Sequence, residues 1–189
     1  YARQVGIDIF SSPFDETAVD LLEELKTPAY KIASFELCDL PLIKYVASKN
    51  KPILISTGLA SIQEIDEAIN VIIESNNQKI LLFHCISSYP APIQDANLKN
   101  IQYLRDRYNV EIGLSDHTLG NTAAIASIAL GASAIEKHFT LSRNDQGPDS
   151  KFSIEPDELK ALVRSVNDCY LGLGSKTFKR SKSEEANKV

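Results

Sequence analysis

The sequence predicts an α/β fold in which parallel strands and helices alternate to form a (β/α) barrel. Six short apolar segments alternate with longer amphipathic segments along the chain. This alternation is typical of a mainly parallel sheet that is covered by helices. A serine or a histidine also lies at or just beyond the end of each apolar segment. Because every strand of a barrel ends at the same mouth, where the active site is built, these polar residues favour a barrel.

The predicted strands are short and rich in Ile, Val, Leu and Phe, and most are apolar on both faces, as buried parallel strands are. They cover Val5–Ser11, Ala29–Ser34, Pro52–Thr57, Ile80–Cys85, Val110–Ser115 and Ala134–Phe139. Serine also starts turns and caps helices, so any single serine at a strand end has that simpler reading. Taken over all strands, a shared polar mouth is favoured.

The predicted helices show apolar residues at helical spacing on one face. The segment after Ser61 begins with a capping box, in which the Ser61 hydroxyl caps an amide and Glu64 reaches back. The other helical segments are Asp15–Leu25, Leu40–Ser48, Asn97–Arg107, Asn121–Leu130 and Pro156–Tyr170. We therefore expect one catalytic domain over residues 1–175 and a polar tail or linker over residues 176–189.

Composition excludes several classes of function. The formal charge is -5 and the pI is near 5.3, whereas nucleic-acid and membrane-surface binding both need a basic face. Cys38, Cys85 and Cys169 are far apart and form no CxxC pair. This pattern argues against a disulfide framework and fits a reducing cytoplasm, with each cysteine as a small buried residue.

Two of the three histidines are candidate metal ligands. His117 and His138 lie at the mouth ends of consecutive strands, which run roughly 4.8 Å apart, so both imidazoles can reach one divalent ion. Water, substrate oxygens or a carboxylate must complete the shell. Asp116 and Lys137 face the opposite way and are expected to form a salt bridge behind the site, unless Asp116 caps the next helix. His84, inside an apolar run, reads as a core residue.

A second group of candidates indicates an anionic ligand. Lys31 lies within a strand, where a charge is costly unless it meets an anion such as a phosphate or a carboxylate. The alternative is a lysine that snorkels at a strand start. Ser34 and Glu36 share a face and point into the predicted mouth. Asp149 follows Gly147-Pro148 in a loop above the mouth, which otherwise reads as a surface loop.

Several segments together resemble the N-acetylneuraminate (sialic acid) synthase family, and most closely its pseudaminic acid synthase branch. They occur in order across nearly the whole chain. These segments are Phe10-Ser11-Ser12-Pro13-Phe14, Tyr30-Lys31-Ile32-Ala33-Ser34, Ile55-Ser56-Thr57-Gly58, Ser88-Tyr89-Pro90-Ala91-Pro92, Gly113–Thr118, Ile135–Phe139 and Gly147-Pro148-Asp149.

The resemblance implies an eight-stranded TIM-type barrel, of which this chain holds the third to eighth strands. It implies that the first two strands and a C-terminal antifreeze-like domain are missing. In the family, a glutamate and a lysine on those strands and an arginine from a partner subunit reach the site. The resemblance thus also implies a homodimeric parent.

Residue by residue, His117 and His138 match the family's metal ligands, with Mn²⁺ the usual ion and Mg²⁺ or Co²⁺ alternatives. Glu36 and Asp149 match carboxylates near the sugar and are the catalytic candidates. The positions that match the surroundings of phosphoenolpyruvate are Lys31, Ser12, Ser34, Ser56, Ser87, Tyr89 and Ser115. Ser12 and Ser87 replace residues that are often Thr and Asn in relatives.

The family joins phosphoenolpyruvate to an acetamido sugar, which predicts a metal-dependent synthase of carbohydrate biosynthesis. Ala33-Ser34-Phe35-Glu36 and Lys151-Phe152-Ser153 resemble the pseudaminic branch, whose substrate is a 2,4-diacetamido-2,4,6-trideoxy hexose. Phe152 is then expected to pack on the sugar's methyl group. The alternatives are an N-acetylneuraminate or legionaminate synthase, another phosphoenolpyruvate-using barrel, and an inactive fragment that retains ligand-binding residues.

Overall fold

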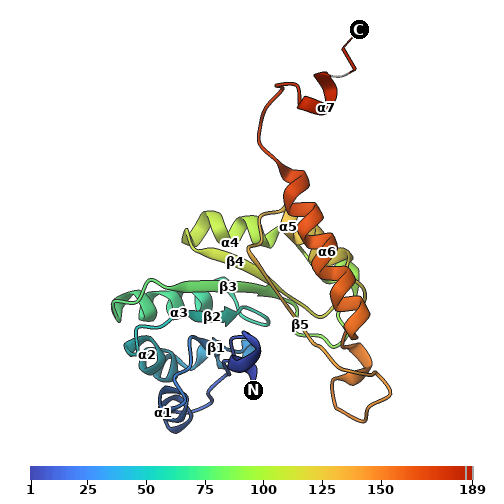
Figure 1. Cartoon of the computed structure of the whole chain (residues 1–189). Coiled ribbons are helices and arrows are strands. Elements are labelled where there is room, and N and C mark those ends of the chain that lie inside the picture. Colours follow the sequence, from blue (N-terminus) through green and yellow to red (C-terminus); the bar gives the residue numbers. More distant parts are fainter. Residues whose placement is uncertain (186, 189) are drawn as a thin grey trace.

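The structure is a computed structural model that describes residues 1–185, 187 and 188, and it is built on one parallel sheet of five strands. The strands occur in chain order across the sheet, each hydrogen-bonded to the next, as in part of a (β/α)8-type barrel (Figure 1). This confirms the predicted incomplete TIM-type barrel. The strands are β1 (Tyr30–Ile32), β2 (Ile53–Ser56), β3 (Ile80–Cys85), β4 (Glu111–Asp116) and β5 (Ala134–Lys137).

A helix follows each strand of the sheet, as a parallel connection requires. The predicted capping box of α3 is present: the Ser61 amide donates to Glu64 Oε2 at 2.7 Å, and the Glu64 amide donates to Ser61 Oγ at 3.3 Å. The helices are α1 (Glu16–Glu24), α2 (Leu40–Ser48), α3 (Ile62–Glu74), α4 (Asn100–Tyr108), α5 (Thr122–Ala129), α6 (Pro156–Leu173) and α7 (Lys182–Glu185). Short 3-10 helices are η1 (Ala2–Val5), η2 (Ser34–Cys38), η3 (Ile93–Asp95) and η4 (Ser150–Phe152).

The strand predicted at Val5–Ser11 is wrong, and the sheet has five strands where six were expected. Residues 2–5 form η1, and the segment that follows is extended but unpaired. One backbone hydrogen bond, from the Lys31 amide to the Ser11 carbonyl at 3.2 Å, joins it to β1. Ile7 and Ile9 are 62% and 61% exposed. The apolar pattern was strand-like, but a strand exists only where a hydrogen-bonded ladder forms.

The last strand is shorter than its apolar pattern predicted, ending at Lys137 rather than at Phe139. The His138 carbonyl accepts a hydrogen bond from the Ile154 amide at 2.9 Å instead of continuing the ladder with β4. The chain therefore leaves the sheet at His138. Alternation along β5 places His138 on the same side as Glu136, so the histidine still faces the mouth just beyond the end of the strand.

The core lies between the sheet and the helices on its outer face. Its large side chains come from strands and helices alike, and the fully buried ones include Tyr30, Ile32, Leu37, Ile43, Ile53, Ile55, Ile72, Leu82, Ile101 and Ile112. Beyond α6 the chain leads away from this body to α7, as Figure 1 shows. Among the described helices, none combines the length and the apolar character needed to cross a bilayer.

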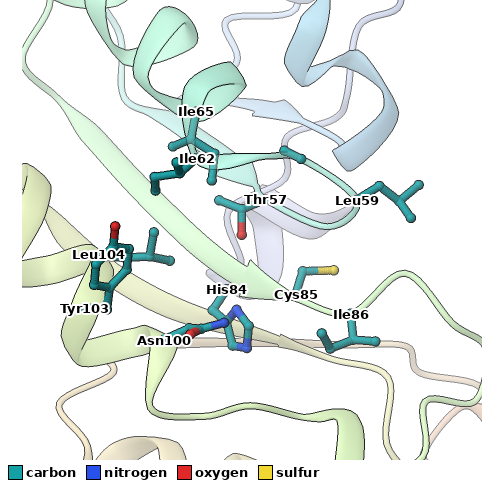
Figure 2. A pocket seen from close by; sticks show the side chains of 11 residues that line it. Thr57, Leu59, Ile62, Ile65, His84, Cys85, Ile86, Asn100, Tyr103 and Leu104 are labelled. Atoms are coloured by element: carbon teal, nitrogen blue, oxygen red, sulfur yellow. The ribbon is translucent and has the colours of Figure 1, made fainter.

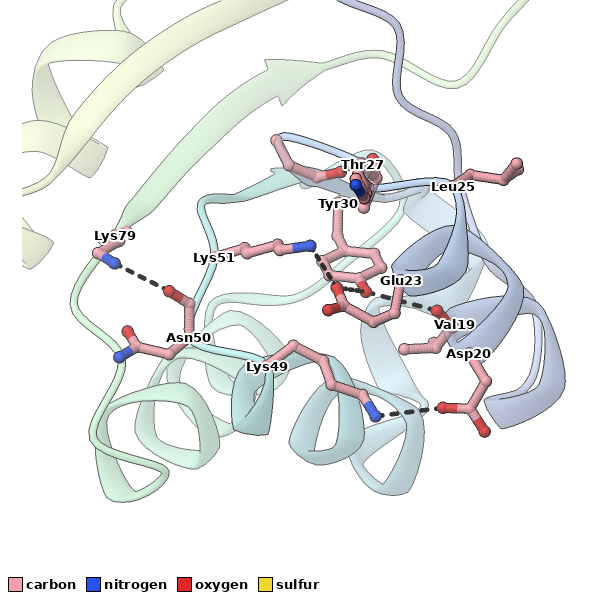
Figure 3. A network of polar contacts seen from close by, with 12 residues as sticks. Val19, Asp20, Glu23, Leu25, Thr27, Tyr30, Lys49, Asn50, Lys51 and Lys79 are labelled. Carbon is pink, nitrogen blue, oxygen red and sulfur yellow. Dashed lines mark hydrogen bonds and ion pairs between the residues drawn. The ribbon is translucent and has the colours of Figure 1, made fainter.

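A polar network secures the edge of the sheet opposite the mouth. Glu23 on α1 accepts hydrogen bonds from the Tyr30 hydroxyl and, at 2.6 Å, from Lys51 Nζ, while Asp20 pairs with Lys49 at 3.2 Å (Figure 3). Partial burial acts to raise the pKa of Glu23, but the hydrogen bonds from Lys51 and Tyr30 outweigh it and lower the pKa below 4.5. The network ties α1 to the starts of β1 and β2.

Replacing Glu23 with glutamine is expected to lower the free energy of unfolding by about 1 kcal/mol at neutral pH. Because the folded-state pKa of Glu23 is depressed, its contribution is present above the unfolded value of about 4.5 and disappears as the pH falls through the folded value. The difference between wild type and Glu23→Gln should therefore vanish in acid. Urea unfolding from about pH 6 to pH 3 measures it. Exposed Glu24→Gln is the control, and an equal effect there would contradict the assignment.

Candidate active site

A cavity of about 110 Å³ opens at the carboxyl ends of the strands, where the sequence predicted the mouth. Seven of the predicted site residues line it, contributed by β1, β2, β4 and the segments that follow β1, β3, β4 and β5. The lining residues are Lys31, Ala33, Ser34, Phe35, Ser56, Cys85, Tyr89, Ser115, His117, Glu136 and His138.

Lys31 is the buried cation of this cavity. It is 8% exposed, and its Nζ donates to Ser56 Oγ at 2.6 Å and lies 3.6 Å from Glu136 Oε2. Burial lowers the pKa of Lys31, and the nearby Glu136 carboxylate opposes that shift. Lys31 therefore does not snorkel to solvent, and its charge is aimed into the cavity as predicted for an anion-binding lysine.

Register places the two central polar residues of the cavity side by side. Ser115 on β4 pairs with Glu136 on β5, and the Ser115 hydroxyl donates to Glu136 Oε1 at 2.7 Å. Glu136 was not among the predicted site residues. The signal was present, because strand alternation puts it on the same side as His138.

His117 and His138 come together as predicted, with ring centroids 5.3 Å apart. His117 Nδ1 lies 2.8 Å from the Ile86 carbonyl oxygen, which can only accept, so this nitrogen carries the proton and Nε2 keeps its lone pair in the neutral ring. His138 Nδ1 lies 3.3 Å from Asp149 Oδ2, which also accepts, so Nδ1 carries the proton in this ring too. Burial and the neighbouring His117 lower the pKa of His138. Within the described residues, no three His, Cys, Asp or Glu side chains form a metal-ligating cluster.

The predicted salt bridge behind the site is present. Lys137 Nζ lies 2.7 Å from Asp116 Oδ2, and the two side chains are 5% and 1% exposed. Asp116 does not cap α5. Its other oxygen instead accepts from the Thr118 amide at 2.9 Å and from the Thr118 hydroxyl at 2.7 Å.

An aromatic wall stands over the two histidines. Tyr89 packs on His117 with ring centroids 4.3 Å apart, and Phe152 lies 5.5 Å from Tyr89 and 5.0 Å from His138. Phe152 belongs to η4, in the loop that also carries Asp149. The loop predicted to cover the mouth therefore contributes both an apolar ring and a carboxylate beside His138.

Three further predicted residues, Ser87, Glu36 and Ser12, are not part of the cavity lining. Ser87 Oγ is buried without a hydrogen-bond partner, and a Cβ on Gly58 would overlap both Ser87 Oγ and Ser34 Oγ. Glycine at position 58 thus lets two hydroxyls converge. Glu36 lies in η2 with a buried, unpartnered Oε2, outside the lining. In the described part of the chain, no contact joins Ser12 to the cavity.

Two of the cysteines, Cys85 and Cys38, differ in where they lie: the first is in the site and the second is at the surface. Cys85 is buried at the end of β3, lines the cavity, and lies 3.8 Å from Ser34 Oγ and 3.9 Å from His117 Nδ1. It was expected only as core, and its place opposite Ser115 in the β3–β4 register was the missed signal. Cys38 is exposed, so its predicted burial is wrong, because η2 turns it outward.

A larger cavity of about 390 Å³ lies beside the site, between the start of α3 and α4 (Figure 2). Cys85 at the end of β3 and Ile86 just after it line this cavity, and no Asp, Glu, Lys or Arg is among its lining residues. His84 also lines it, with Nε2 at 2.7 Å from the Ala96 carbonyl oxygen, which agrees with a satisfied core histidine. An uncharged wall suits neutral groups, so the smaller, charged cavity is the candidate active site for an anionic ligand.

The floor of the site depends on a close approach between β3 and β4. The Phe83 ring lies below Lys31, with Nζ 5.7 Å from its centroid, and packs against Gly113. A Cβ at Gly113 would lie 2.6 Å from Phe83 and 2.8 Å from the Ala134 carbonyl oxygen. Glycine is therefore the residue that lets β4 sit between the Phe83 ring and β5.

A family model described as the NeuB family matches residues 1–178. The N,N'-diacetyllegionaminic acid synthase of Campylobacter jejuni is 45% identical over 99% of this chain and 57% of its own length. The pseudaminic acid synthase of Helicobacter pylori is 46% identical over 92% of this chain and 51% of its own length.

Solved structures agree with these matches. The N-acetylneuraminic acid (sialic acid) synthetase of Leptospira borgpetersenii, in complex with citrate, superposes with a TM-score of 0.92 at 35% identity, over 98% of this chain and 65% of that one. The chain spans about half the length of the curated relatives it matches.

Gly113→Ala is expected to lower the free energy of unfolding by about 1–3 kcal/mol, because the added methyl group overpacks the floor between Phe83 and Ala134. Gly172→Ala in α6 is the matched control. A Cβ there meets no atom within 4 Å, so this change should raise stability by up to about 1 kcal/mol. Thermal and urea unfolding of both variants measure the difference. Equal effects at the two positions would contradict the close approach at Gly113.

Proposed function

Since the chain belongs to the NeuB family, we propose that it forms most of a catalytic barrel that condenses phosphoenolpyruvate with an acetamido sugar to give a nonulosonic acid and phosphate. The observation that carries this proposal is the charged cavity in which Lys31, three serines and two histidines converge. Lys31 is buried with its charge toward the cavity and 3.6 Å from the Glu136 carboxylate, so it offers an anionic ligand a fixed positive charge that is shielded from water. Phosphoenolpyruvate is an anion that also carries a carbon nucleophile.

The residues present fit a divalent metal ion beside that anion. His117 and His138 each have Nδ1 held by an oxygen acceptor, which leaves Nε2 as the ligand atom, as is usual for metal-bound histidines. Water and substrate oxygens would complete the shell of Mn²⁺, Mg²⁺ or Co²⁺. The chemistry that such an ion supplies is Lewis-acid polarisation of the sugar's aldehyde oxygen.

The protein's own groups would bind and orient phosphoenolpyruvate. Lys31 and the hydroxyls of Ser34, Ser56 and Ser115 surround the cavity and offer hydrogen-bond donors to its phosphate and carboxylate. Fixing the enol carbon C3 against the aldehyde carbon replaces an encounter in solution by a positioned reaction. C3 bonds to that carbon, water adds at C2, and the C2–O bond to phosphate breaks.

Proton transfer falls to the carboxylates nearest the reacting atoms. Asp149 lies beside His138, at the sugar side of the cavity, and Glu136 lies between Ser115 and Lys31, at the anion side. We assign to Asp149 the proton transfers at the sugar's hydroxyl groups. We assign to Glu136 the removal of a proton from the water that adds at C2. Glu36, which lies outside the lining with one buried carboxylate oxygen, stays a candidate carboxylate near the sugar.

For the sugar we propose a 2,4-diacetamido-2,4,6-trideoxy hexose, which makes the product pseudaminic acid. The wall made by Tyr89 and Phe152 places apolar surface beside His138, where a sugar bound through its aldehyde would extend. A 6-deoxy sugar presents a methyl group to such a surface. A sugar with a hydroxyl group on that carbon would present a polar group to the same surface.

A second candidate is a chain that binds these ligands without turnover. Within the described residues, β1 and β5 each pair with one neighbouring strand, so the sheet does not close on itself. An open sheet leaves one side of the cavity without a wall. Phosphoenolpyruvate binding without steady phosphate release, after Mn²⁺ and each sugar are added, would favour this alternative over an autonomous enzyme.

Lys31→Met is expected to weaken phosphoenolpyruvate binding to the 189-residue chain about 10- to 100-fold, because it removes a charge-assisted hydrogen bond. Isothermal titration with phosphoenolpyruvate measures the affinity. Lys44→Met, on α2 away from the cavity, is the matched control and should bind as wild type does. Wild-type affinity in Lys31→Met would exclude the proposed anion site.

Phe152→Ala is expected to reduce the preference for a 6-deoxy sugar over its 6-hydroxy counterpart by about 3- to 30-fold, because apolar surface over the methyl group is lost. Saturation-transfer NMR with both sugars, with phosphoenolpyruvate and Mn²⁺ present, measures their relative binding. Phe35→Ala, at another part of the cavity lining, is the comparison. A preference that survives in Phe152→Ala would exclude Phe152 as the specificity residue.

A further inference from the structure

The buried ion pair behind the histidines joins the two strand ends that carry them. Asp116 is the last residue of β4 and Lys137 is the last residue of β5, and they are direct partners in the parallel register. Their side chains meet at 2.7 Å on the side of the sheet away from the cavity, with exposures of 1% and 5%. His117 and His138 are the next residues along the chain, so the pair lies one residue from each proposed ligand.

The same pair also holds the turn that carries His117. Lys137 Nζ donates to the Thr118 carbonyl at 2.9 Å, and Asp116 accepts from the Thr118 amide and hydroxyl. Residues 116, 118 and 137 thus form one hydrogen-bonded unit around His117. A movement of β5 relative to β4 at this point would have to stretch or break these bonds.

Other backbone hydrogen bonds hold the two histidines to different segments of the chain. The His117 carbonyl accepts from the Ala91 amide, and the His138 carbonyl accepts from the Ile154 amide, both at 2.9 Å. The contact between Ser115 and Glu136 also crosses from β4 to β5, but it faces the cavity and is open to exchange when a ligand binds. The ion pair crosses between the same strands outside the lining of this cavity, and both of its side chains are almost fully buried.

A buried ion pair is a poor device for stability alone, because desolvation offsets much of its attraction, and an apolar pair of similar volume is often as good. What an ion pair adds is a defined geometry, because both charged groups must keep the distance and angle of a hydrogen bond. We propose that Asp116 and Lys137 are positioning residues that set the separation of His117 and His138 for a shared divalent ion. This inference rests on the proposed metal site.

The test compares Mn²⁺ binding by the 189-residue chain and by the double variant Asp116→Asn/Lys137→Met. Removing both charges together avoids leaving one buried and unpaired, so the variant should fold. Mn²⁺ affinity, measured by titration calorimetry, should fall about 10- to 100-fold, as for other changes to the partners of metal ligands. Thr118→Val, which keeps both charges and the shape of the side chain, should lower the affinity by a smaller factor and serves if the double variant does not fold.

Lys51→Met is the matched control, because it removes an ion pair with Glu23 at the opposite edge of the sheet. It should lower stability without changing Mn²⁺ affinity. A folded double variant with Mn²⁺ affinity within about twofold of wild type would overturn the inference, as would an equal loss in Lys51→Met.

A metal-free measurement separates this inference from the metal proposal. In nitrogen–proton NMR spectra of the imidazoles, the double variant and Thr118→Val should shift or broaden the signals of both His117 and His138. His84, held by Ala96 in another part of the sheet, should keep its signal. If wild type binds no Mn²⁺ but both ring signals respond, the metal proposal fails and the positioning role stands. An unchanged His138 signal in both variants would overturn that role.

Discussion

The parallel register between β4 and β5 is the constraint on which the rest of this site depends. It sets Ser115 against Glu136 on the cavity side and Asp116 against Lys137 on the opposite side. Because side chains alternate along a strand, a slip of β4 by one residue would turn Asp116 toward the cavity and Ser115 away from it, and Lys137 would lose its partner. Because Gly113 has no side chain, β4 can lie close to both the Phe83 ring and the Ala134 carbonyl of β5, and this close spacing allows the register to form.

Charge is distributed in the molecule according to the role of each region. Ion pairs between α1 and the neighbouring strand and helix ends secure the amino edge of the sheet, and the carboxyl edge holds Lys31, Glu136 and the two histidines. The larger cavity beside the site is lined without formal charge. Size therefore does not identify the site, whereas charge does, because the smaller cavity holds Lys31 and Glu136 beside the two histidines.

Much of the architecture was predictable from residue patterns. The bounds of α2 and β3 agree with prediction, and the capping box of Ser61 and Glu64 is present. These elements have strong local signals: helical spacing, a cap, or a short apolar run between turns. Val5–Ser11 had a comparable apolar pattern but forms no strand, because pairing depends on residues that are distant along the chain. For the same reason the pattern did not show that β5 ends at Lys137.

The sequence by itself determined which chemical groups stand at the strand ends, and so it predicted Lys31, Ser115, His117 and His138 as neighbours around one mouth. Strand direction alone carries that information, since parallel strands end at a common edge. Only the tertiary structure decided that Cys85 and Glu136 line the same cavity, that Glu36 lies outside its lining, and that Cys38 faces outward. Those outcomes depend on register and on where each segment leaves the sheet, which are set by packing between elements distant along the chain.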